Sequence, residues 1–168
     1  RAGPPLEVDL AHPLDLRRGL AHAGDDDQAR LGRLGTLELE EALAVGLEHA
    51  RRGRPTQEDV ALVLGCGAIG LGVIAGLGLM GIAPIVAADF HPQRRALAIR
   101  MGAEIAIDPR EISPYAPIPD LGGRHVNLVY ENVGMPGLLQ QIIQSVAFDS
   151  RIVMGGYCME AEQILVFS

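Results

Sequence analysis

Residues 60–70 read Val-Ala-Leu-Val-Leu-Gly-Cys-Gly-Ala-Ile-Gly, a short apolar run followed by three glycines in the spacing G-x-G-x-x-G. An uninterrupted apolar run with two valines is typical of a strand that is buried on both faces of a parallel sheet. Gly65 permits a tight turn after this strand, Gly67 leaves room for a diphosphate beside the backbone, and Gly70 lets a new helix approach the strand. The free amides and the positive dipole end of that helix would then face the phosphates.

A carboxylate follows the second apolar run of the chain. The helix that the glycines open is expected to extend to about Met80, and residues 85–88 predict a strand that ends at Asp89. Asp89 lies 19 residues beyond Gly70, close to the separation of about 20 residues at which an acidic side chain binds the adenosine ribose of a dinucleotide. The alternative is that Asp89 only caps the helix that begins at His91-Pro92.

The composition indicates one soluble globular domain. The 168 residues are 48% hydrophobic and 21% charged, with a net charge of −7 and no lysine. Such a chain is long enough for a single core, and its acidic balance argues against a nucleic-acid-binding surface. Glycines interrupt the apolar run over residues 68–85, which argues against a membrane span. The sequence has two cysteines, Cys66 and Cys158, which fits a reducing, cytoplasmic location. They form no C-x-x-C pair, so no structural zinc site is expected.

Apolar runs and helical patterns alternate along the rest of the chain. Strands are predicted over residues 60–64, 85–88, 104–107, 126–130 and 151–154. Helices are predicted over residues 37–52, 68–80, 92–101 and 138–146. Four prolines in residues 109–125 predict a loop, and residues 1–35 show no sustained period and are expected to form an irregular N-terminal extension. The interior glycines of the second helix weaken it by about 1 kcal/mol each, and tight packing against the sheet is the expected compensation.

This order of elements predicts an α/β fold with a doubly wound parallel sheet, because the crossovers between parallel strands are right-handed. The predicted strand order is 3-2-1-4-5. Ligands of such sheets bind beyond the carboxyl ends of the strands, here at the switch between strands 1 and 4. The candidate cofactor-binding residues that this rule brings together are Gly65, Gly67, Ala68, Ile69, Gly70, Asp89, Asn132, Val133, Gly134, Gly155 and Gly156.

Five motifs in sequence order resemble the medium-chain dehydrogenase/reductase family, which includes the zinc-dependent alcohol and polyol dehydrogenases. They are residues 41–46 (Glu-Ala-Leu-Ala-Val-Gly), 63–71 (Val-Leu-Gly-Cys-Gly-Ala-Ile-Gly-Leu), 95–103 (Arg-Ala-Leu-Ala-Ile-Arg-Met-Gly-Ala), 131–134 (Glu-Asn-Val-Gly) and 155–156 (Gly-Gly). The first resembles the helix that enters the nucleotide domain, the second the glycine fingerprint, and the third the segment after the second strand. The last two resemble loops near the nicotinamide. The match covers about 130 residues, from about Leu39 onward.

The resemblance implies that residues 36–168 are the NAD-binding Rossmann domain of an enzyme that transfers hydride between an alcohol and nicotinamide. It implies NAD rather than NADP, because Asp89 would repel a 2′-phosphate. It also places Arg94 beside the adenine, so Arg94 joins the candidate cofactor-binding residues. The alternative is a plain salt bridge between Arg94 and a nearby Glu or Asp.

The chain also departs from the family pattern. The Cys, the His-Glu pair and the clustered cysteines that bind zinc in the family's catalytic domain are not found in this sequence, and its five histidines are isolated. Glu41 matches a position at the catalytic zinc of polyol-dehydrogenase-like members, but one ligand is too few for zinc. The sixth strand is expected to be missing as well. We therefore expect a truncated product that binds NAD(H) weakly, has no catalytic residue or metal site of its own and oxidises no alcohol alone.

Two other functions stay open. A non-catalytic nucleotide-binding module, or a truncated remnant, would need a second copy or another chain along the open edge of the sheet. An S-adenosylmethionine-dependent methyltransferase has a similar sheet, but it usually carries an acidic residue before the glycine turn, where this chain has Leu64. The substrate is not evident from the sequence under any of these hypotheses.

Overall fold

The computed structural model describes residues 36–118, 121 and 123–156, with the side chains of residues 36–39 excepted. The N-terminal extension predicted for residues 1–35 lies outside the described residues. Cys158 and the rest of residues 157–168 lie outside them too.

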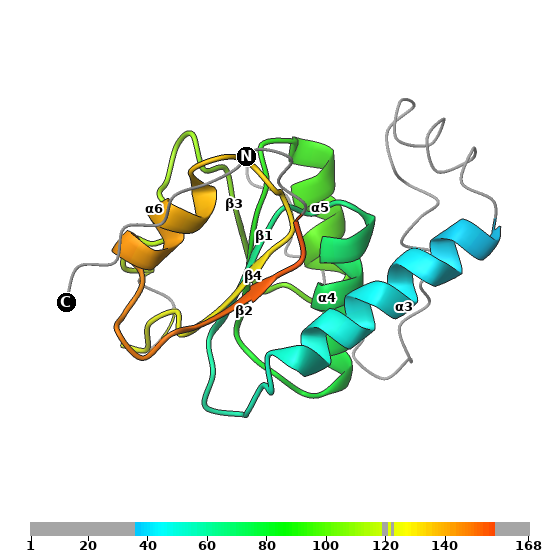
Figure 1. The fold of residues 1–168 in the computed structure, drawn as a ribbon, viewed down its shortest axis with the longest axis horizontal. Coiled ribbons are helices and arrows are strands. Elements are labelled where there is room, and N and C mark those ends of the chain that lie inside the picture. The colour runs from blue at the N-terminus through cyan, green and yellow to red at the C-terminus, as the bar shows by residue number, and fades with distance from the viewer. Residues whose placement is uncertain (1–35, 119–120, 122, 157–168) are drawn as a thin grey trace, which may run out of the picture.

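A five-stranded parallel sheet forms the centre of the molecule (Figure 1). Its strands are β1 (Ala61–Leu64), β2 (Ile85–Ala88), β3 (Ile105–Ile107), β4 (Leu128–Glu131) and β5 (Arg151–Met154). They lie in the order β3-β2-β1-β4-β5 and every pair is parallel. The predicted fold class and strand order are therefore confirmed.

Helices cover both faces of this sheet (Figure 1). They are α3 (Thr36–Arg52), α4 (Ala68–Leu79), α5 (Pro92–Arg100) and α6 (Leu138–Ser145). Successive residues of a strand point to opposite faces, so Val63 packs in the core under α4 and α5, whereas Leu62 packs in the core under α6. No helix in the described part of the chain is both long and apolar enough to cross a membrane.

The observed elements agree with the predicted ones to within two residues at each end, and β2 and β5 agree at both ends. The largest shift is in β4, which begins at Leu128 instead of residue 126 and includes Glu131. Asn127 lies just before the strand, and its side-chain Oδ1 accepts the N–H of Val60 at 2.8 Å. Glu131 stays in the strand because it pairs with Leu64 of β1 and Met154 of β5. The proline-rich connection contains no α-helix among its described residues.

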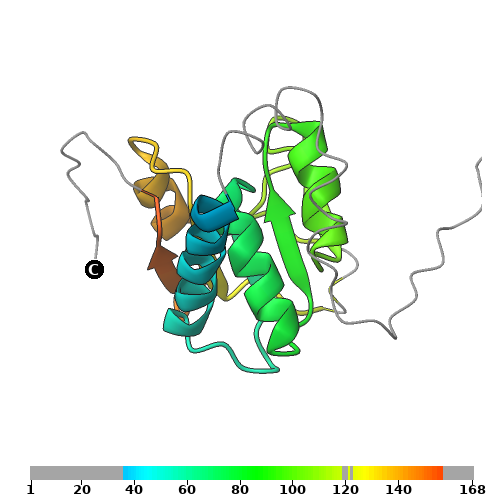
Figure 2. The same ribbon diagram turned by 90° about the vertical axis from the view of Figure 1, so that its right-hand side faces the viewer.

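The two helices α3 and α4 lie side by side (Figures 1 and 2), and glycines lie at their contact. A Cβ added at Gly46 would lie 2.6 Å from the Cα of Gly72, and one added at Gly76 would lie 3.0 Å from the Cβ of Ala50. The missing side chains thus allow two helix backbones to meet. We expected the interior glycines of α4 to pack against the sheet. This expectation is wrong for Gly72 and Gly76, because they pack against α3. Gly78 faces open space.

A buried carboxylate connects the amino ends of the strands to the segment that follows α3. Asp59 is 3% exposed and forms an ion pair with Arg151 of β5. The same carboxylate accepts hydrogen bonds from Thr56 and from the side chain of Asn127, at 2.6 and 2.9 Å. Arg151 also donates to the backbone oxygen of Gly53. Burial raises the pKa of Asp59, but the hydrogen bonds from Arg151 and Thr56 outweigh it and hold the pKa below its ordinary value.

Two glycine-to-alanine changes test the helix contact. Gly46→Ala is expected to lower the free energy of unfolding by about 1 to 3 kcal/mol, because its new methyl group would overlap the backbone of α4. Gly78→Ala is the matched control, and it is expected to raise that free energy by about 0.5 to 1 kcal/mol, because alanine favours an exposed helix more than glycine does. Urea unfolding of both variants measures the difference. Changes of the same sign and size would contradict the close contact.

Replacing Asp59 tests the buried ion pair. Asp59→Asn is expected to lower the free energy of unfolding by about 2 kcal/mol near neutral pH, since it removes a charged acceptor from buried donors. The folded-state pKa of Asp59 is depressed, so its contribution is present above the unfolded-state pKa and is lost as the pH falls below about 4. The difference from the unmodified chain should therefore shrink in acid.

The exposed Asp149 provides the control, because Asp149→Asn should change the free energy of unfolding by less than about 0.5 kcal/mol. Urea titrations of all three chains at several pH values make the comparison. The difference in the free energy of unfolding between Asp59→Asn and the unmodified chain could also stay constant down to about pH 3. This result would show that the charge of Asp59 does not provide the stabilisation.

Candidate functional site

A cleft of about 810 Å³ lies at the carboxyl ends of the parallel strands. It is centred where the strand order reverses, with β1 between β2 and β4. Six of the predicted cofactor-binding residues line it, namely Gly65, Gly67, Asp89, Arg94, Asn132 and Val133. The other six lie in the adjoining turns and the first turn of α4, namely Ala68, Ile69, Gly70, Gly134, Gly155 and Gly156.

The glycine turn between β1 and α4 forms the floor of this cleft. Gly65 has φ +84°, a conformation that favours glycine, and its N–H donates to the carbonyl of Ala88 at 2.9 Å. The helix can lie close to the turn because Gly70 has no side chain. A Cβ at this position would overlap the carbonyl of Gly65. A Cβ at Gly67 would meet no protein atom within 4 Å among the described residues. The bare backbone at Gly67 therefore opens onto the cleft.

The amino end of α4 begins at this opening. Gly67 is the N-cap residue, and no described side chain caps the helix or places an acidic group in its first turn. The first amides of a helix have no partner within the helix, and they carry the positive end of its dipole. Ala68, Ile69 and Gly70 therefore present backbone donors of the kind that bind phosphate groups.

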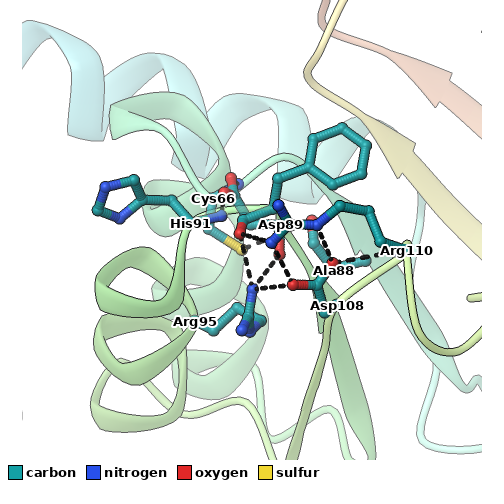
Figure 3. A network of polar contacts seen from close by, with 8 residues as sticks. Cys66, Ala88, Asp89, His91, Arg95, Asp108 and Arg110 are labelled. Atoms are coloured by element: carbon teal, nitrogen blue, oxygen red, sulfur yellow. Dashed lines mark hydrogen bonds and ion pairs between the residues drawn. The ribbon is translucent and has the colours of Figure 1, made fainter.

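Asp89 ties the glycine turn to the end of β2 (Figure 3). One carboxylate oxygen accepts the N–H of Cys66 at 2.8 Å and the other accepts the N–H of His91 at 2.7 Å. Each oxygen keeps a second lone pair for a further donor. His91 is the N-cap residue of α5 and Pro92 is its first residue, as predicted. Asp89 thus supports the entry to α5 and also lines the cleft.

Arg94 stands beside this carboxylate. Its guanidinium lies 3.9 Å from Asp89, and its side chain is 37% exposed. The predicted salt bridge with a nearby acidic residue is therefore present. Because Arg94 also lines the cleft, the ion pair does not remove it from contact with a ligand, and both alternatives considered for this residue are compatible with its position.

A second carboxylate, Asp108 at the end of β3, organises two further arginines (Figure 3). Arg95 donates to Asp108 at 3.0 Å and to the backbone oxygens of Asp89 and Phe90 at 2.8 and 2.9 Å. Arg110 binds both carboxylate oxygens of Asp108 and donates to the Phe90 carbonyl at 2.8 Å. The hydrogen bond from Arg110 lowers the pKa of Asp108 well below its ordinary value.

Sequence reasoning missed this group as part of the site. Phe90, Arg110 and Tyr115 all line the cleft, yet none was among the predicted cofactor-binding residues. A signal was available, because Asp108 follows a predicted parallel strand and the carboxyl ends of such strands lie at the ligand-binding edge. The same rule that selected Asp89 after β2 would have selected Asp108 and Arg110 after β3.

The turns after β4 and β5 meet around another buried carboxylate. Glu131 is 1% exposed, and its Oε1 accepts the N–H groups of Val133 and Gly134 at 2.6 and 2.7 Å. Its backbone oxygen accepts the N–H groups of Gly155 and Gly156. The predicted glycines at these positions therefore bring the two turns into direct contact. Val133 is 42% exposed and extends into the cleft lining.

Two titratable groups near the cleft are held in their neutral form. Burial raises the pKa of the Cys66 thiol to about 12. Burial and, after it, the charge of Glu131 raise the pKa of Tyr115 to about 12. Neither group is therefore a base or a thiolate nucleophile near neutral pH.

The described residues hold no group of three or more His, Cys, Asp or Glu side chains that fits a metal ion. Glu41, considered above for zinc, is an exposed residue of α3. His49 is also on α3, and its buried Nδ1 has no hydrogen-bond partner within the described structure. Zinc therefore does not fit the side chains in the described part of the chain.

Comparison with known proteins places this geometry in a family. The profile of the family described as zinc-binding dehydrogenase matches residues 68–168. (R,R)-butanediol dehydrogenase of Bacillus subtilis is 36% identical over 117 residues, which are 69% of this chain and 34% of that protein. The crystal structure of 2R,3R-butanediol dehydrogenase from Bacillus subtilis matches with a TM-score of 0.66 and 33% identity, over 76% of this chain and 37% of that chain.

A structure described as a short chain alcohol dehydrogenase from Escherichia coli CFT073, solved in complex with NADH, matches with a TM-score of 0.65 and 25% identity. This match covers 74% of the present chain and 37% of the other. The present chain spans about a third of the length of the curated relatives that it matches. The family profile covers more than half of its residues, and the sheet order agrees with that assignment. This protein belongs to the zinc-binding dehydrogenase family.

Proposed function

We propose that residues 36–168 bind NAD(H) as the coenzyme-binding part of a zinc-type alcohol or polyol dehydrogenase. The single observation that carries this proposal is the bare backbone of Gly67, which opens onto a cleft that also contains the Asp89 carboxylate. The first position suits a phosphate and the second suits ribose hydroxyls, and a nucleotide supplies both groups.

The described side chains fit a dinucleotide in three places. The uncapped amides of α4 supply donors and positive dipole charge for the diphosphate. Asp89 keeps one lone pair on each carboxylate oxygen for the two ribose hydroxyls. The volume of about 810 Å³ lies in the ordinary range of small-molecule sites.

The charge of Asp89 favours NAD over NADP. Its side chain is 9% exposed, and a 2′-phosphate that replaced one ribose hydroxyl would bring a dianion next to this carboxylate. Two negative groups that lie next to each other repel strongly where water is partly excluded. The structure of the related Escherichia coli alcohol dehydrogenase contains NADH, which supports the same preference.

The reaction proposed for the parent enzyme is hydride transfer between an alcohol and the nicotinamide ring. The similar proteins named above act on butanediol and other alcohols according to their names, and this supports an alcohol or polyol as the substrate class. Within such an enzyme the residues of this chain would bind and orient the cofactor. A second copy or another chain at the open edge of the sheet stays a prediction, and so does a cytoplasmic location.

Replacing Gly67 separates ligand binding from stability. Gly67→Val is expected to leave the melting temperature nearly unchanged, because its side chain would enter open space. It should weaken NADH binding at least about tenfold, because that space is where the diphosphate would lie. Fluorescence titration of NADH and thermal unfolding measure the two effects.

Gly78→Val serves as the control for the Gly67 experiment, because it also adds a side chain to open space but lies away from the cleft. Its NADH affinity should match that of the unmodified chain. Equal NADH affinity in Gly67→Val and Gly78→Val would contradict the proposed phosphate position.

Replacing Asp89 tests the ribose position. Asp89→Asn is expected to weaken NADH binding about five- to fiftyfold, since a charged acceptor becomes a neutral one with fewer acceptor sites. NADPH binding should weaken less or improve, because the repulsion of the 2′-phosphate is removed. The ratio of the two dissociation constants is the measurement, with Asp149→Asn as an exposed control. An unchanged NADH-to-NADPH ratio would show that Asp89 does not face the adenosine ribose.

A further inference from the structure

Arg110 stands out among the cleft residues because it is both exposed and held in place. Its side chain is 62% exposed, yet its guanidinium donates to both carboxylate oxygens of Asp108 and to the carbonyl of Phe90. Long cationic side chains on a surface usually lose considerable conformational entropy when they bind a ligand. A guanidinium that is already fixed by three acceptors avoids most of this loss.

The guanidinium of Arg110 lies over an aromatic ring. Its central carbon is 5.5 Å from the centre of the Phe90 ring, within the range of a cation–π contact. Phe90 is itself 52% exposed, and both residues line the cleft. A planar cation that packs on one face against an aromatic ring leaves its other face free for a second flat group.

The position of this pair relative to Asp89 identifies the second flat group. Phe90 follows Asp89 directly, and Arg95 donates to the backbone oxygens of both residues. The proposed function places the adenosine ribose on Asp89, so the base attached to that ribose lies next to Phe90 and Arg110. Adenine offers a π face and ring nitrogens that accept hydrogen bonds, which suits a guanidinium plane.

We propose that Arg110 stacks on the adenine of the cofactor, and that Asp108 positions it. This inference rests on the proposed NAD(H) binding. The stack consists of the Phe90 ring, the Arg110 guanidinium and the adenine. Asp108 is 6% exposed and does not line the cleft, so it acts on the ligand through Arg110 and not by contact.

The planar shape of the guanidinium carries this role, and its charge alone does not. A lysine at position 110 would keep the positive charge but could neither bind both oxygens of Asp108 in one plane nor stack on a base. Arg110→Lys and Arg110→Ala should therefore have similar effects. This sets the proposal apart from simple attraction between a cation and a phosphate, which lysine would preserve.

The test measures binding of NADH and of AMP, which contains only the adenosine half, to the full chain. NADH binding is followed by fluorescence, and AMP binding by displacement of NADH. Arg110→Ala and Arg110→Lys are each expected to weaken both ligands by about three- to tenfold. Arg52→Ala is the matched control, because Arg52 is 65% exposed on α3, away from the cleft. Its affinities should stay within about twofold of those of the unmodified chain.

A double variant tests the role of Asp108. If Asp108 acts through Arg110, Asp108→Asn weakens NADH in the unmodified chain but adds less than about twofold in the Arg110→Ala background. Additive losses would instead assign its effect to Arg95, which shares the carboxylate, and would overturn the positioning role. The melting temperature of each variant shows whether the fold is retained, and the comparison is made between chains that are folded at the titration temperature.

The outcomes also distinguish this inference from the proposed function. If the unmodified chain binds no NADH, the proposed function fails and this inference fails with it. If the chain binds NADH and Arg110→Ala binds it equally well, only the adenine stack is overturned. Weaker NADH with unchanged AMP would overturn it too, because Arg110 would then serve the other half of the cofactor. Full retention of affinity in Arg110→Lys would show that charge is sufficient and the planar stack is absent.

Discussion

The hydrogen bond from the Cys66 amide to the Asp89 carboxylate, 2.8 Å long, is the contact on which the geometry of the cleft depends. It connects the turn after β1 to the end of β2, two strands that are already parallel neighbours. The sheet brings the two strand ends to the same edge, and this bond sets how the turn faces the carboxylate. Because the other oxygen of Asp89 holds the start of α5, one side chain coordinates a strand, a turn and a helix. The floor of the cleft is therefore connected to β2 and to α5 by the contacts of one side chain.

Much of the fold was predictable because its information is local. Each buried strand is a short apolar run, and right-handed crossovers leave few orders for five parallel strands. The ends of the strands were less predictable, since pairing decides them. Glu131 belongs to β4 only because neighbours on both sides pair with it. The contact between α3 and α4 was missed for a related reason, because the glycines show that a close neighbour exists without showing which element it is.

The candidate site also has one part that the sequence predicted and one part that it did not. The glycine turn and Asp89 are separated by a spacing that the chain itself displays, so sequence alone brought them together. The group formed by Phe90, Asp108 and Arg110 has no such spacing. It arises because β2 and β3 are adjacent in the sheet and because one carboxylate holds two arginines from different segments. The position of Asp108 and Arg110 after a strand could have selected them, but their contacts with each other and with Phe90 depend on tertiary packing, which no periodicity reveals.

The distribution of charge at this edge has a consequence for the rate of complex formation. Arg94, Arg95 and Arg110 stand around Asp89 and Asp108, so this group of five side chains carries a net charge of +1 within a chain whose net charge is −7. A dianionic ligand is repelled by most of such a surface and attracted near its destination. The three arginines would favour encounters of an anionic ligand with this edge of the sheet, and added salt would weaken that effect by screening their charge. The arginines thus favour a kinetic route into the cleft as well as a bound state.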